Sequence, residues 1–293
     1  MRSENQDRSY VDDAAGIFLV VDGLGGHAAG EKAAEIALAT IPAELHTADG
    51  DPRQRIRQAI ATANNRICEL ARENEEWRGM ACVLTLAMMD GDKVLVGHVG
   101  DSRLYLIWNG SIRKLTSDHS PVGEQEDRGE LTEQQAMQHP RRHEVFRNVG
   151  SRLHEPEDDE FVEMKEFLFK PDAAILLCSD GLSDLVTAAE ICEIVERYDG
   201  EPETIARELV DAANHAGGKD NITVVFVAGS EFLGNGSPEM VQARVRHSIT
   251  RVRGGAGEGK RSVLARLGNV LISRVAFLIY GFVIGVVLAL AWR

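Results

Sequence analysis

The sequence predicts an α+β fold in which two antiparallel sheets form the core, helices cover them, and a transmembrane helix follows at the C-terminal end. Three observations predict it. Apolar strands at 80–89, 93–99 and 103–108 follow one another through short connections. Helical segments arrive in pairs before and after them, which favours two packed sheets with helices outside. Residues 275–292 are eighteen positions without a charged side chain, long enough to span a bilayer.

The first expected strand, at 16–21, is apolar throughout, which indicates burial on both faces. Residues 22–26 connect it to a helix over 28–45. A second amphipathic helix starts with Pro52 in its first turn and runs to about residue 75. Its apolar positions include Ile56, Ile60, Ile67 and Leu70.

The three strands of the middle third form an antiparallel meander, because Asp90-Gly91-Asp92 and Asn109-Gly110 are turn sequences. Residues 116–150 are rich in charge, His and Gln, and predict an irregular surface insertion with one short helix near 132–138. The remaining elements are expected as strands at 160–169 and 173–178, helices at 187–197 and 201–216, and a last strand at 222–227.

The composition is that of a globular protein: 293 residues, 44% of them hydrophobic, can build one large domain and an appendage. The net charge of −14 is divided unevenly, because residues 241–293 carry +8 and residues 1–240 carry −22. An acidic domain binds nucleic acid poorly and gains from cations, so we expect no nucleic-acid partner. Four cysteines without paired spacing are expected to be reduced core residues: Cys68, Cys82, Cys178 and Cys192.

The acidic part and the basic tail indicate a division into a domain at 1–229, a flexible basic linker at 230–270 and a transmembrane helix at 271–292. Basic residues crowd the N-terminal side of the apolar run, and Arg293 alone follows it, so the domain is expected on the cytoplasmic side of a membrane. A buried core helix is the alternative. No N-terminal signal peptide is visible, which predicts a single-pass C-terminal anchor.

Four carboxylates stand where apolar runs end: Asp22, Asp101, Asp180 and Asp220. Any one of them could be a plain turn residue, since Asp bonds its own backbone and Gly supplies positive φ. If all four converge, they repel one another unless a cation lies between them. Together they indicate a multinuclear metal site.

The residues around these acids carry a resemblance. Asp22-Gly23-Leu24-Gly25-Gly26-His27, Gly100-Asp101-Ser102-Arg103, Ser179-Asp180-Gly181-Leu182 and Asp220-Asn221-Ile222-Thr223 resemble, in order and spacing, motifs of bacterial metal-dependent serine/threonine phosphatases of the protein phosphatase 2C type. The opening Arg2-Ser3-Glu4-Asn5-Gln6-Asp7 is similar to that family's first motif. The resemblance covers residues 1 to about 229 and implies an α-β-β-α sandwich with residues 116–150 as a mobile flap beside the active site.

The resemblance also implies a ligand set. Asp22 would bridge two tightly bound Mn²⁺ or Mg²⁺ ions, the Gly23 carbonyl would complete one ion, and Asp180 and Asp220 would hold the other. Asp101, with Asp180 and in some arrangements Asp184, resembles the ligands of a third, weaker ion. Oxygen ligands suit these hard cations.

Three further residues receive catalytic roles by resemblance. Arg2 matches the arginine that contacts the substrate phosphate, and Asp7 matches an acceptor that orders metal-bound water. His27 is a candidate general acid, with a helix-start contact as the alternative, because Leu24 stands where eukaryotic relatives carry a His. The other histidines, including His98, His119 and His143, are expected to be structural or on the surface.

The sequence therefore predicts a monomeric, membrane-tethered phosphatase that uses a metal-bridged water to hydrolyse phosphoserine and phosphothreonine in proteins phosphorylated by a Ser/Thr kinase. A catalytically silent phosphoprotein-binding scaffold of the same fold is the alternative. A regulator acting on an anti-sigma-factor antagonist is a third, although such relatives usually carry sensor domains.

Overall fold

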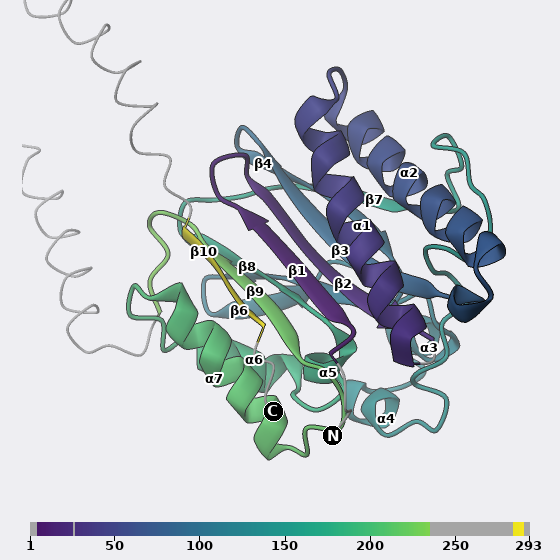
Figure 1. The fold of residues 1–293 in the computed structure, drawn as a ribbon. Helices are drawn as coiled ribbons and strands as arrows, with labels where there is room; N and C mark the ends of the chain where they lie inside the picture. The colour runs from purple at the N-terminus through teal and green to yellow at the C-terminus, as the bar shows by residue number, and fades with distance from the viewer. Residues whose placement is uncertain (1–4, 26, 235–283, 290–293) are drawn as a thin grey trace, which may run out of the picture.

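Two five-stranded antiparallel sheets lie face to face in the computed structural model, which describes residues 5–25, 27–234 and 284–289 (Figure 1). For residues 27, 28 and 284–289 the description covers the backbone alone. Helices cover the outer face of each sheet, so the predicted α+β fold is confirmed.

The first sheet has the order β1-β2-β3-β4-β7, and the second has the order β10-β9-β8-β5-β6. The strands of the first sheet are β1 (Asp7–Asp12), β2 (Ile17–Leu24), β3 (Ala81–Asp90), β4 (Lys93–Val99) and β7 (Glu163–Leu168). The strands of the second sheet are β5 (Arg103–Trp108), β6 (Ser111–Lys114), β8 (Ala173–Cys178), β9 (Thr223–Ala228) and β10 (Ile284–Ala289).

Two pairs of long helices form the outer layers: α1 (His27–Thr47) and α2 (Pro52–Glu73) lie against the first sheet, and α6 (Ala188–Val195) and α7 (Pro202–His215) lie against the second (Figure 1). There are also shorter helices in the described chain. The 3₁₀ helix η1 (Glu75–Trp77) lies between α2 and β3, α3 (Pro121–Asp127) and α4 (Glu133–Met137) lie in the insertion, and α5 (Asp180–Ser183) follows β8.

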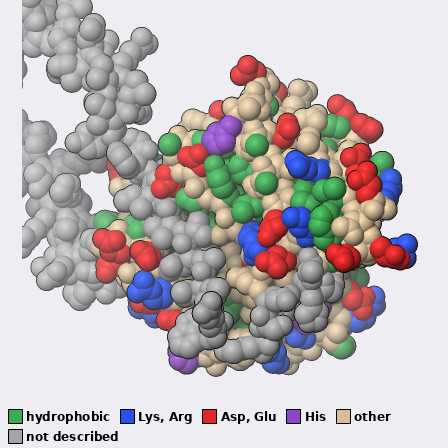
Figure 2. All heavy atoms as spheres, viewed as in Figure 1, with side chains coloured by type: hydrophobic (Ala, Val, Ile, Leu, Met, Phe, Trp, Pro, Cys, Tyr) green, Lys and Arg blue, Asp and Glu red, His purple; other side chains and the backbone are tan. Residues whose placement is uncertain are grey.

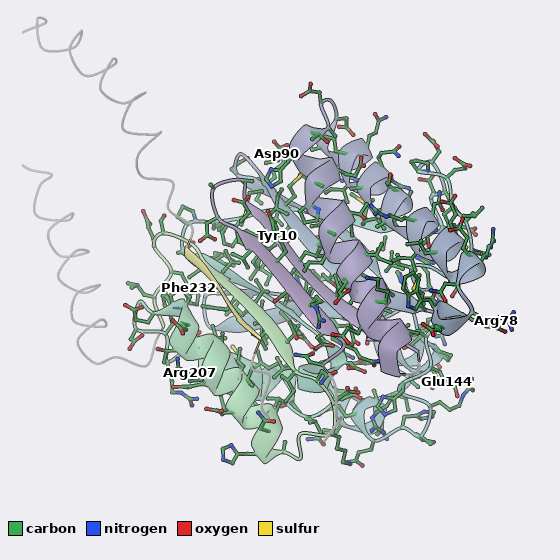
Figure 3. All side chains as sticks on the ribbon, in the orientation of Figure 1. Tyr10, Arg78, Asp90, Glu144, Arg207 and Phe232 are labelled. Carbon is green, nitrogen blue, oxygen red and sulfur yellow. The ribbon has the colours of Figure 1, made fainter. Side chains whose placement is uncertain are left out.

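The core has three apolar layers, because successive residues of a strand point to opposite faces of its sheet. In β2, Leu19 and Val21 pack against helices, and Phe18 and Val20 pack between the sheets. Burial of each such side chain contributes about 1.5–3 kcal/mol. Phe232, just after β9, closes the layer under α7 by packing on Tyr198 and Phe226 (Figure 3). The prediction that the strand at 16–21 is buried on both faces is therefore confirmed.

Two strands escape prediction because both lie at or near a sheet edge and lack an apolar run. β1 reads Asp-Arg-Ser-Tyr-Val-Asp and β6 reads Ser-Ile-Arg-Lys, and both are mostly half-buried or exposed. The other predicted strands and long helices of residues 5–234 agree with the structure to within about three residues at each end. The four cysteines are free and buried, as expected.

The C-terminal apolar run differs from its prediction. Residues 284–289, expected within a helix over 271–292, form β10, which pairs antiparallel with β9 from Ile284↔Ala228 to Ala289↔Thr223. The sequence Ile-Gly-Val-Val-Leu-Ala is rich in β-branched residues, which suit a strand at a sheet edge as well as an apolar helix. The rest of the predicted helix lies outside the described residues. Within the described chain, no helix has the length and apolar character needed to cross a bilayer.

The face of the domain shown in Figure 2 is mixed in charge, because the described Lys and Arg side chains there lie among Asp and Glu rather than in one continuous basic patch.

Candidate metal centre

Five carboxylates meet at one end of the two sheets. Strands β2, β4 and β8 run toward this end and β9 starts from it, so residues far apart in sequence come together. They line a cleft of about 430 Å³ together with Gly23: Asp22, Asp101, Asp180, Asp184 and Asp220. The structure thus brings together every residue that the sequence proposed as a metal ligand.

Mutual repulsion and burial act on these acids. Burial raises the pKa of Asp22 well above its ordinary value, and the charges of Asp7, Asp180, Asp101 and Asp220 raise it further. Burial, followed by Asp180, likewise raises the pKa of Asp101. Such a cluster is difficult to keep ionised without a positive charge among its members.

One carboxylate oxygen is left without a protein partner. Asp180 Oδ1 is buried and accepts no hydrogen bond from any described residue. A buried oxygen of this kind is costly unless another group satisfies it. Each of the five carboxylates offers a metal ion only oxygen atoms as ligands. The site therefore fits a hard divalent cation such as Mn²⁺ or Mg²⁺.

Asp7 lies behind the ligands, opposite Asp22 in the register of β1 and β2. Its Oδ2 accepts a hydrogen bond of 2.8 Å from Ser179 Oγ, which in turn accepts one of 3.0 Å from Thr223 N. Burial is the main reason that the pKa of Asp7 rises to about 6. Asp7 therefore ties β1 to the strand ends that present Asp180 and Asp220.

Two close backbone contacts require glycine. A Cβ on Gly23 would lie 2.3 Å from the Gly30 carbonyl oxygen, because α1 packs directly on the end of β2. A Cβ on Gly181 would lie 1.9 Å from the Asn221 oxygen. The second contact sets the spacing between the loops that carry Asp180 and Asp220.

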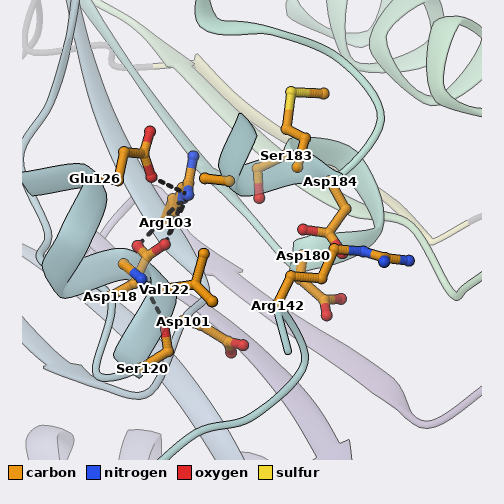
Figure 4. Close-up of a pocket in the computed structure, with 13 residues that line it drawn as sticks. Asp101, Arg103, Asp118, Ser120, Val122, Glu126, Arg142, Asp180, Ser183 and Asp184 are labelled. Carbon is orange, nitrogen blue, oxygen red and sulfur yellow. Dashed lines mark hydrogen bonds and ion pairs between the residues drawn. The ribbon is translucent and has the colours of Figure 1, made fainter. Parts of the chain in front are cut away.

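The insertion between β6 and β7 supplies two side chains to the cleft that the sequence did not assign. Arg142 Nε donates to Asp184 Oδ2 at 2.9 Å (Figure 4). His143 Nδ1 lies 3.5 Å from the same oxygen. The Asp180 carboxylate, whose Oδ2 lies 3.9 Å from Nδ1, is the main cause that raises the pKa of His143. His143 is exposed, as expected, but it faces the acids. Lys219 also lines the cleft. No local pattern marks any of the three.

A buried ion network anchors the insertion beside Asp101. Arg103 donates to Asp118 and to Glu126, with Nη2–Oδ2 and Nη2–Oε2 distances of 2.7 and 2.9 Å (Figure 4). Burial alone would raise the pKa of Asp118, but the charges of Arg103 and Lys114 and the hydrogen bonds from Arg103 together hold that pKa below the ordinary value. The root of the insertion is thereby fixed to β5.

Two of the predicted catalytic residues cannot be placed. Arg2 lies outside the described residues. His27 is the first residue of α1, and its side chain lies outside the described part of the chain.

Comparison with known proteins gives a consistent result. The family model for protein phosphatase 2C matches residues 2–212. The serine/threonine phosphatase stp of Listeria welshimeri is 35% identical over 238 residues, which cover 78% of this chain and 91% of the relative. The Mycobacterium tuberculosis serine/threonine phosphatase PstP has a similar crystal structure, with a TM-score of 0.68, 31% identity, and 76% and 92% of the two chains covered. A PstP catalytic domain in complex with two manganese ions gives a TM-score of 0.67 at 29% identity, covering 76% and 91%.

Proposed function

The chain belongs to the protein phosphatase 2C family, and we propose that it hydrolyses phosphoserine and phosphothreonine in proteins with the help of divalent metal ions. The observation that carries this proposal is the convergence of the strand-end acids in one cleft, where Asp180 Oδ1 is buried and accepts no hydrogen bond from the described residues.

The residues that would bind the metal ions are among those that line the cleft. Asp22, the Gly23 carbonyl, Asp180 and Asp220 would hold two tightly bound ions. Asp101, Asp180 and Asp184 would hold a third, weaker ion. Bound Mn²⁺ or Mg²⁺ supplies Lewis acidity and a nucleophilic water at neutral pH.

The chain's own residues supply position and charge. Asp7, held by Ser179, keeps the strand ends in register behind the ligands. Arg142 and Lys219 are cationic side chains in an otherwise acidic cleft, where they reduce the repulsion of a phosphate dianion. A guanidinium is well suited to phosphate oxygens because its donors lie in one plane.

A thiolate mechanism is disfavoured by the cysteines near the site. Burial raises the pKa of the Cys178 thiol to about 12. Burial also raises the pKa of the thiol of Cys82, which pairs with Gly23 in the sheet. A nucleophilic cysteine needs the opposite shift. Hydrolysis by water therefore fits these surroundings better.

The test is metal-dependent release of phosphate from a phosphothreonine peptide. We expect Mn²⁺ to support the reaction, EDTA to abolish it, and Asp180→Asn to reduce it at least a hundredfold. Asp12→Asn changes a carboxylate of β1 away from the cleft and should leave the rate within twofold. A folded, Mn²⁺-binding chain without activity would instead support the silent scaffold, and activity in EDTA would refute the metal mechanism.

We further propose that residues 271–292 attach the chain to a membrane, with the catalytic domain on the cytoplasmic side and kinase-phosphorylated proteins as substrates. The support is the sequence: an uncharged run of eighteen residues preceded by basic residues. Attachment as a helix would require residues 284–289 to leave β9. Fractionation of cells should recover the full chain with membranes and a chain ending at residue 234 in the supernatant. Recovery of the full chain in the supernatant would contradict attachment.

A further inference from the structure

Two buried histidines stand behind the loop that presents Asp101. His98 lies in β4 and is fully buried, and His119 lies at the root of the insertion with 6% of its surface exposed. Their ring centroids are 4.8 Å apart. Neither residue faces the cleft, and the proposed hydrolysis uses neither.

His119 forms two hydrogen bonds to the backbone of Gly100, the residue before Asp101. His119 N donates to the Gly100 carbonyl at 2.7 Å, and Gly100 N donates to His119 Nδ1 at 2.9 Å. Gly100 has a φ of +115°, and a Cβ there would lie 2.1 Å from Val83 Cγ1. The loop conformation therefore depends on glycine and on an acceptor placed where His119 Nδ1 is.

The backbone of Ser102, the residue after Asp101, is held by the second histidine through a threonine. Thr85 Oγ1 donates to the Ser102 carbonyl at 2.9 Å and lies 2.9 Å from His98 Nδ1. Because Thr85 Oγ1 uses its one hydrogen on the Ser102 carbonyl, His98 Nδ1 carries the ring proton and donates it to Thr85 Oγ1. Asp101 is thus held on both sides by hydrogen bonds that start from the histidine pair.

The His119 ring is committed to its bond with Gly100 and is a poor metal ligand. Because Gly100 N donates to His119 Nδ1, the ring proton lies on Nε2, and no lone pair is left for a cation. Burial lowers the pKa of His119 to about 2, with the positive charges of His98, Arg147 and Lys165 acting in the same direction. His119 is therefore a neutral acceptor.

His119 also connects Asp101 to the far end of the insertion. Phe146 N donates to the His119 carbonyl at 3.0 Å. Residues 142 and 143, which face the acids, lie just before Phe146. His119 therefore contacts both the loop that carries Asp101 and the segment that follows Arg142 and His143.

We propose that His119 is a positioning residue for the third cation: by holding the Gly100 peptide from the root of the insertion, it aims Asp101 at the corner shared with Asp180 and Asp184. This inference rests on the proposed function, since it assumes that the corner binds a divalent ion. His98 and Thr85 support the same loop from the Ser102 side.

Calorimetric titration of the full, metal-free chain with Mn²⁺ tests the proposal. His119→Leu removes the acceptor and should weaken the weak site about tenfold, as expected for one lost buried hydrogen bond, while the two tight sites stay within twofold. His119→Asn keeps an acceptor near the position of Nδ1 and should stay within threefold of the original chain at every site.

A second pair of variants covers the case in which His119→Leu fails to fold. Thr85→Val removes the bond to Ser102 with little change of shape and should weaken the weak site several-fold. Thr40→Val is the matched control, because Thr40 is also buried but its Oγ1 has no hydrogen-bond partner among the described residues. It should change no site.

The outcomes separate the two proposals. The positioning role would be overturned if the weak site of a folded His119→Leu or Thr85→Val chain kept its Mn²⁺ affinity. It would also be overturned if all sites lost affinity equally, or if His119→Asn weakened the weak site as much as His119→Leu. An original chain that binds only two ions would also overturn it and leave the proposed hydrolysis standing. A chain that binds no Mn²⁺ would refute both.

Discussion

Replacing Asp7 by asparagine should stabilise the metal-free protein at neutral pH. Asp7 is 2% exposed, and its pKa rises from 3.8 to about 6 in the folded chain, mainly through burial and partly through Asp180 and Asp220. The folded state thus binds the proton more tightly than the unfolded state. The difference between about 6 and 3.8 corresponds to about 3 kcal/mol lost from the unfolding free energy when Asp7 is ionised.

The sign of the pH dependence follows from the same values. The penalty is fully present above a pH of about 6, where folded Asp7 is ionised, and it disappears as the pH falls toward 3.8, where both states are protonated. Asparagine carries no charge at any pH and can still accept the hydrogen bond from Ser179 Oγ. Asp7→Asn should therefore gain about 3 kcal/mol at pH 7.5, or about 6–12 °C in Tm, and less at pH 5.

Chemical unfolding in EDTA at pH 7.5 and 5, followed by tryptophan fluorescence, measures this difference. Asp12→Asn is the control on the same strand: a hydrogen bond from the Ala15 backbone lowers the pKa of Asp12, so its replacement should cause a small loss of stability instead. The reasoning is refuted if Asp7→Asn is no more stable than the original chain at pH 7.5, or if its advantage is the same at both pH values.

Two further substitutions test the geometry of the cleft. Arg142→Gln removes the ion pair between the insertion and Asp184, so KM for a phosphopeptide should rise about tenfold. Arg141→Gln breaks an exposed ion pair within the insertion and should leave KM unchanged. Equal effects of the two substitutions in steady-state kinetics would contradict a role for Arg142 in the cleft. Gly181→Ala places a Cβ 1.9 Å from the Asn221 oxygen and should cost about 1–3 kcal/mol by thermal unfolding. Gly91→Asn, in an open turn with φ +64°, should cost less than about 1 kcal/mol, and a reversed order would contradict the packing argument.

Local signals account for most of the fold and for the ligand acids. The apolar run at 16–21 followed by Asp22 predicts both a buried strand and a carboxylate at its end, because each depends on a few neighbouring residues. The same holds for Asp180 after β8. Convergence of the acids then follows from pairing of antiparallel strands, which brings their ends to one edge.

Residues placed by long-range contacts escape such reasoning. Arg142 reaches the cleft because it pairs with Asp184, 42 positions later, and nothing in the charged sequence of the insertion distinguishes it from Arg141. His119 likewise owes its role to Gly100 on another loop. The C-terminal apolar run is ambiguous for a related reason. Its length fits a bilayer-spanning helix, but its β-branched residues also suit a strand along the edge of β9. Whether the run forms a helix or a strand depends on whether it contacts a bilayer or β9.

The apolar layers hold the acids together against their own repulsion. Phe18, Val20 and their neighbours fill the space between the sheets, so the strand ends cannot separate without exposing the core. Burial, with repulsion added to it, therefore raises the pKa values of Asp7, Asp22 and Asp101, and the cleft stays closed by the core. A cation that enters finds ligands already in place, and its binding should relieve the same repulsion that Asp7→Asn relieves in part. Stabilisation by Mn²⁺ should therefore be smaller in the Asp7→Asn chain than in the original, because less repulsion is left to remove.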